Sequence, residues 1–173
     1  MENDIRGEVR VIGPDEAPSF WQPVPANGFV RCILGARELG TGFSMGTQTV
    51  APGCMVREHT HDRHDEVIHI TEGQGFARIE GEDRPIGIGS TVYLGRNRRH
   101  GFVNPGPGPM SFVWFLAPGG LEDFFAAIGR PRTPGEPAPE PFPRPADVAA
   151  IERRTVFGWA DQVPITPPRH EGA

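Results

Sequence analysis

Short apolar runs, many of them alternating with polar residues, recur along the first two thirds of the chain and are separated by glycine and proline. Runs of this kind, rich in Val, Ile, Phe and Thr, are typical of β-strands. Residues 14–25 read as a loop, and residues 81–83 as a hairpin turn. We expect strands at residues 9–12, 29–34, 43–50, 67–71, 76–80, 91–94, 100–103 and 110–116. The pattern therefore predicts an all-β fold.

The pattern changes after Pro118. Residues 121–128 have apolar positions at helical spacing, acidic residues in the first turn and a glycine at the end, which predicts a short helix packed on the strands. Residues 130–145 are rich in proline and should be extended, and residues 146–154 read as a second short helix. We expect a barrel with N-terminal strands at residues 1–118 and a helical, proline-rich C-terminal extension at residues 119–173.

Potential metal ligands gather around the middle strands. His59 and His61 are separated by one residue, so in a strand their side chains point to the same face. Glu66 opens the next strand, and a polar turn at residues 62–65 joins the two, so two imidazoles and one carboxylate can meet. His100 opens a later strand and would add a third imidazole. This donor set suits one divalent transition metal ion (Fe, Mn, Ni, Co, Cu or Zn) and leaves positions open for substrate.

A simpler interpretation treats these histidines as hydrogen-bonded core residues, which is the commoner role of a single buried histidine. Four donors at this spacing favour the metal site, because ligands occur as convergent groups. Two other histidines do not fit the set. His64 lies in the turn between ligands, where we expect it to be solvated, and His69 should point outward if Glu66 points inward.

The spacing of these residues resembles the paired sequence motifs of the cupin superfamily. The first motif is matched in full, and its residues are Gly53, His59, His61, Glu66 and Gly73. The second is matched at Gly89, His100 and Asn104. Gly95 replaces the usual proline and Asn97 the usual glycine, but both tolerate the positive φ of a tight turn. The resemblance implies a jelly-roll β-barrel with the metal inside.

The C-terminal extension is similar, more loosely, to that of small bacterial cupins of the quercetin-dioxygenase-like group. The similar positions are Gly119, Gly120, Phe124, Phe125, Ile128 and Gly129. In that group the tail helices lie over one opening of the barrel, so the resemblance implies a lid that excludes water from the metal. Members of the superfamily are often dimers, so we also expect a homodimer.

The resemblance leads to three hypotheses about function. The first is a metal-dependent dioxygenase that acts with O2 on an enol or a phenolic, flavonol-like small molecule, with Glu66 as both ligand and general base. The second is an isomerase, cyclase or lyase that needs the metal but not O2. The third is a protein that binds a small ligand without turnover. One fold supports many chemistries, so the substrate remains open.

Composition excludes other classes of function. The chain has 173 residues, a net charge of -5 and a pI of about 5.7, which does not favour binding to nucleic acid. No apolar run approaches the length of a membrane span. Cys32 and Cys54 are too few for a disulfide framework, and residues 1–10 lack the apolar segment of a secretion signal. We therefore expect a cytoplasmic protein.

Overall fold

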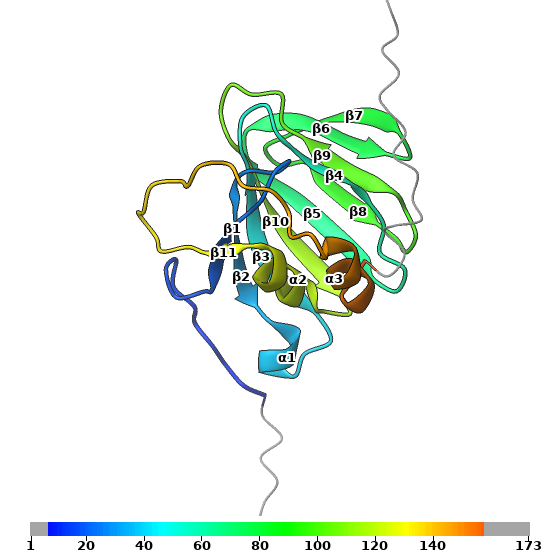
Figure 1. Ribbon diagram of the computed structural model, residues 1–173. Helices are drawn as coiled ribbons and strands as arrows, with labels where there is room; N and C mark the ends of the chain where they lie inside the picture. The colour runs from blue at the N-terminus through cyan, green and yellow to red at the C-terminus, as the bar shows by residue number, and fades with distance from the viewer. Residues whose placement is uncertain (1–6, 158–173) are drawn as a thin grey trace, which may run out of the picture.

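The strands pair into two antiparallel sheets in the computed structural model, which describes residues 7–157 (Figure 1). The larger sheet has the order β11 (Arg130–Pro131), β1 (Ser19–Trp21), β2 (Phe29–Leu34), β3 (Ser44–Val50), β10 (Met110–Ala117), β5 (Asp65–Glu72) and β8 (Thr91–Leu94). The smaller sheet has the order β4 (Met55–His59), β9 (His100–Val103), β6 (Gln74–Ile79) and β7 (Glu82–Gly87).

The two sheets enclose one apolar core. Alternate residues of β10 fill it from the larger sheet, with Phe112 and Trp114 fully buried, and Ala77 and Phe102 enter it from the smaller sheet. Gly46 of β3 lies directly opposite Trp114, and the indole occupies the space that any larger side chain there would need. This arrangement agrees with the jelly-roll barrel expected from the sequence.

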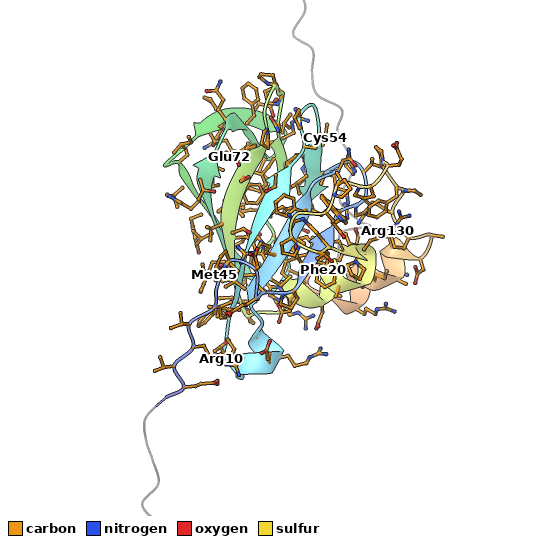
Figure 2. All side chains as sticks on the ribbon, turned by 90° about the vertical axis from the view of Figure 1, so that its left-hand side faces the viewer. Arg10, Phe20, Met45, Cys54, Glu72 and Arg130 are labelled. Carbon is orange, nitrogen blue, oxygen red and sulfur yellow. The ribbon has the colours of Figure 1, made fainter. Side chains whose placement is uncertain are left out.

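The helices of the C-terminal extension pack on the barrel, as expected. Helix α2 (Leu121–Ile128) buries Leu121, Phe124, Phe125 and Ile128 in the same core as the strands. Helix α3 (Val148–Arg154) adds Ile151 to that core. Figure 2 shows both helices on one side of the molecule, with Met45 and Glu72 on the opposite side. Among residues 7–157, no helix has the length and apolar composition that crossing a membrane requires.

The structure differs from the expected elements at the N-terminus. Residues 9–12 do not form a strand, and Val9 and Val11 are 89% and 93% exposed. An apolar alternation needs a neighbouring strand to become part of a sheet, and none pairs with this segment among the described residues. The expected loop at residues 14–25 instead contains β1, which pairs with β2 and β11.

Strand β7 and one short helix were not expected from the sequence. Strand β7 pairs with β6, and the turn between them consists of Glu80 and Gly81, which both have positive φ. The hairpin therefore closes one residue earlier than expected. The short helix α1 (Ala36–Leu39) interrupts the connection between β2 and β3. Neither change affects the strands that carry the expected ligands.

Candidate metal centre

Three of the four expected ligands lie on strands, and all four meet inside the barrel. His59 ends β4 and pairs with His100 at the start of β9, whereas His61 lies two residues beyond β4, so the two histidines do not share one strand as expected. Glu66 lies on β5, whose alternation buries Glu66, Ile68 and Ile70 and exposes His69. One nitrogen or oxygen of each ligand lies within 4.8 Å of the others, and all four side chains are at least 93% buried.

Backbone carbonyls fix the orientation of all three imidazoles. The Nδ1 atom of His59 lies 2.8 Å from the oxygen of Arg57, and that of His100 lies 2.7 Å from the oxygen of Arg98. The Nδ1 atom of His61 lies 3.1 Å from the oxygen of Val156, beyond α3. A carbonyl can only accept, so each Nδ1 carries the proton and each neutral ring keeps a lone pair on Nε2.

Burial lowers the pKa of two of the three imidazoles. It lowers the pKa of His59 well below the ordinary value, with repulsion from His100 and His61 adding to the effect. It also lowers the pKa of His61 to about 4, although the charge of Glu66 acts in the opposite direction. Burial alone would raise the pKa of Glu66, but the interactions with His100 and His61 outweigh it and leave that pKa lowered. Neutral imidazoles and an ionised carboxylate are the forms that bind metals.

Three atoms of this group have no hydrogen-bond partner among the described residues, although all are buried. They are Nε2 of His61, Nε2 of His100 and Oε2 of Glu66. The carboxylate oxygen lies 2.9 Å from His100 Nε2 and 3.7 Å from His61 Nε2, so lone pairs face one another. A cation between them would satisfy all three atoms at once. The group could therefore hold a metal ion, and its nitrogen and oxygen donors suit a divalent transition metal.

Comparison with known proteins agrees with this geometry. The sequence model of the family described as Cupin domain matches residues 46–116, the segment that contains all four residues. This part of the chain is a cupin domain. Over 147 residues the chain is 28% identical to the tetracenomycin polyketide synthase protein TcmJ of Streptomyces glaucescens, covering 84% of this chain and 89% of TcmJ.

Solved structures share the cupin fold at low sequence identity. The polyketide cyclase RemF of Streptomyces resistomycificus has a TM-score of 0.57 and 17% identity, covering 64% of this chain and 80% of RemF. A protein of Thermotoga maritima described as a predicted oxalate decarboxylase has a TM-score of 0.57 and 19% identity, covering 62% of this chain and 98% of that protein. At such identity these likenesses show the fold alone.

The two other histidines of the cupin domain, His64 and His69, differ in their exposure to solvent. His69 points outward, as expected, and its Nδ1 lies 2.9 Å from Thr91 Oγ1. The expectation that His64 is solvated is wrong, because the side chain is 93% buried and its ring lies 6.0 Å from that of His61. Gly120 and Val156 of the C-terminal extension line the same hollow as His64.

A cavity of about 70 Å³ opens beside the centre and is lined by three of the four ligands, His59, His61 and Glu66. Its walls are largely apolar, and Phe102, Phe112, Phe124, Phe125 and Phe157 contribute aromatic rings. Phe157 follows α3 and lies 5.1 Å from the His59 ring and 5.0 Å from the His61 ring, between centroids. The C-terminal extension therefore supplies part of the wall next to the centre. Such a cavity suits an apolar or aromatic ligand with few polar groups.

Four polar residues in the cavity wall were missed by sequence reasoning. Gln48 Nε2 donates to Gln22 Oε1 at 2.7 Å, and Arg57 and Arg144 lie in the wall as well. The alternation of β3 could have placed Gln48 inside, because Gln48 lies two residues from the inward positions Gly46 and Val50. No local signal marks Gln22 or Arg144, which reach the cavity from loops that only the tertiary structure brings there.

Both arginines of the wall contact one buried carboxylate. Arg57 and Arg144 each direct Nη2 to Oε1 of Glu152 on α3, which ties the C-terminal extension to β4. Burial, followed by repulsion from Arg144, lowers the pKa of Arg57 to about 10, so the guanidinium stays charged at neutral pH. By contrast, Arg78 pairs with Asp83 on the outer hairpin and does not line the cavity.

Proposed function

We propose that this protein is a metal-dependent cyclase that acts on a phenolic or polyketide-like carbonyl compound and does not use O2. The observation that carries the proposal is the buried group of three histidines and Glu66 beside an aromatic cavity. The relationship to TcmJ favours polyketide chemistry over the dioxygenase that the sequence resemblance first implied. None of the three relatives named above is described as a dioxygenase.

A divalent cation held by His59, His61, Glu66 and His100 would act as a Lewis acid, lowering the pKa of a substrate hydroxyl or of a carbon next to a carbonyl. The three imidazoles would remain neutral ligands, because their Nδ1 protons are donated to backbone carbonyls. With four protein ligands, one or two positions would stay open for substrate.

Glu66 is the proposed general base. It is the one acidic residue in the cavity wall among residues 7–157, and its Oε2 has no hydrogen-bond partner there. Its lowered pKa keeps it ionised and ready to accept the proton that leaves a substrate carbon or hydroxyl. The deprotonated carbon could then attack a carbonyl carbon of the same molecule, and the proton would return to the new alkoxide oxygen. Loss of this hydroxyl as water and enolisation of the remaining ketones would then give the phenolic ring.

The aromatic wall would shape the substrate and exclude water. A flexible chain with several carbonyl groups cyclises correctly only if two of its carbons are held close together. Phe102 and Phe112 line the cavity from the barrel, and Phe124 and Phe157 line it from the C-terminal extension. We propose that the extension acts as a lid, because it contributes both Phe157 and the Val156 carbonyl that orients His61.

The decisive experiment measures product formation with and without oxygen. Protein purified without a histidine tag would be analysed for bound metal and incubated with a short poly-β-keto thioester under anaerobic conditions. We expect a cyclised phenolic product and no oxygen uptake. Product that forms only in air, with stoichiometric oxygen consumption, would instead support the dioxygenase. No product with any of Mn, Fe, Co, Ni, Cu or Zn would refute both enzyme hypotheses for this substrate class.

Glu66→Gln tests the role of the base. It keeps the size of the side chain, and we expect it to lower kcat by about 10²–10⁴-fold in protein that still contains metal. Glu72→Gln is the matched control, because Glu72 lies at the exposed end of the same strand and contacts Ser111 instead of the centre. Equal turnover by the metal-loaded Glu66→Gln variant and the control would exclude Glu66 as the base.

A further inference from the structure

Two arginines in the wall of the cavity share the carboxylate of one glutamate. Arg57 and Arg144 both line the cavity, and both contact the same oxygen of Glu152. Glu152 is 95% buried and is not itself part of the wall. Arg57 also donates from Nη1 to the Glu58 carbonyl oxygen at 3.3 Å, and the two guanidinium groups have further N–H donors.

The cluster has one positive charge in excess within the described part of the chain. Neither Arg57 nor Arg144 has an ion pair there with an acid other than Glu152. Glu66 is the one acidic residue of the wall among residues 7–157, and it faces His61 and His100. A partly buried charge is costly unless it is paired, so the excess cation favours an anion inside the cavity.

The arginines and residues of the candidate metal centre line the same cavity. Arg57 and His59 lie two residues apart on β4, and the pairing of β4 with β9 is irregular between Val56 and His59. Arg144 and several aromatic side chains line this cavity as well. A flat aromatic molecule could therefore reach the centre with one substituent and the arginines with another.

We propose that Arg57 and Arg144 bind a carboxylate of the substrate while an oxygen at the opposite end of the substrate faces the metal centre. This inference rests on the proposed function and narrows its substrate class to aromatic or polyketide-like carboxylic acids. A carboxylate matches the planar fork of a guanidinium. It also carries the single negative charge that balances the cluster, whereas a phosphate monoester carries nearly two.

The test compares two probes that differ only in this charge, 4-hydroxybenzoate and 4-hydroxybenzamide. Calorimetric titration of the metal-loaded protein should show that the carboxylate binds about tenfold more tightly or better, as expected for hydrogen bonds to a charged group. Arg144→Gln should reduce this ratio to below about threefold. This variant keeps the contact between Arg57 and Glu152, so α3 stays attached to β4.

Arg37→Gln is the matched control, because Arg37 is an exposed arginine that pairs with Asp123 outside the cavity, and it should keep the full preference. Equal binding of the two probes by the wild-type protein would overturn the proposal, and so would binding of neither at millimolar concentration.

Repeating the titration without metal separates the arginines from the metal centre. If the arginines bind the carboxylate, the preference should persist after the metal is removed. A preference that vanishes with the metal but survives in Arg144→Gln would assign the carboxylate to the metal and overturn the proposal. None of these measurements depends on turnover, so a failure of the cyclase hypothesis would be seen separately.

Discussion

Removing a metal ion from the candidate centre should lower the free energy of unfolding of this protein. Without a cation, Nε2 of His61, Nε2 of His100 and Oε2 of Glu66 stay buried without hydrogen-bond partners, at a cost of about 1–3 kcal/mol each. A cation present at about 1,000 times its dissociation constant would stabilise the folded state by about 4 kcal/mol. For a chain of this size, that free energy corresponds to a rise in Tm of about 8–16 °C.

Thermal unfolding followed by circular dichroism measures this effect. Protein stripped with a chelator would be compared with samples given Mn, Fe, Co, Ni, Cu or Zn. His100→Ala should abolish the metal-dependent rise in Tm, because it removes a ligand that is 99% buried at the centre. His69→Ala should keep it, because His69 is exposed and contacts Thr91. No rise with any of the six metals, or an equal rise in both variants, would refute the reasoning.

Three further predictions concern stability. Burial lowers the pKa of His61 from about 6.5 to about 4, so between these pH values the unfolded chain binds a proton that the folded chain does not. The metal-free protein should therefore lose up to about 3 kcal/mol of its free energy of unfolding between pH 7 and 4. Urea titrations that show no loss would contradict this. Gly46→Ala places a methyl group 2.1 Å from the Arg31 carbonyl oxygen and should lower the free energy of unfolding by about 3 kcal/mol or more. The control Gly42→Ala should change little in the same titration, because its methyl group meets no described atom within 4 Å. Phe157→Ala empties a site that is 95% buried and should lower stability by about 3 kcal/mol and weaken metal binding. Phe76→Ala, at a position that is 37% exposed, should do neither. Equal effects of the two substitutions by calorimetry would count against the role of the extension.

The parts of the fold that depend on local pattern could be predicted from the sequence. The strands at residues 29–34, 91–94 and 100–103 and the helix at residues 121–128 have the observed bounds, because each has a regular apolar pattern that ends at a glycine or a polar turn. The strand expected at residues 9–12 failed because its alternation has no partner among the described strands. Strand β1 was missed because three residues carry too little pattern to be recognised.

The sequence by itself predicted the four candidate ligands, since strand alternation and the positions of turns are local properties, and they put His59, Glu66 and His100 on inward faces. His61 lies two residues beyond β4 and joins the group from the turn. The tertiary structure decided everything that depends on contacts between distant segments. The Val156 carbonyl reaches His61 across 95 positions of the chain, and Arg144 and Glu152 join Arg57 from elements far along the sequence. No local pattern encodes such contacts, because they form only when the C-terminal extension packs against the barrel and buries its apolar side chains.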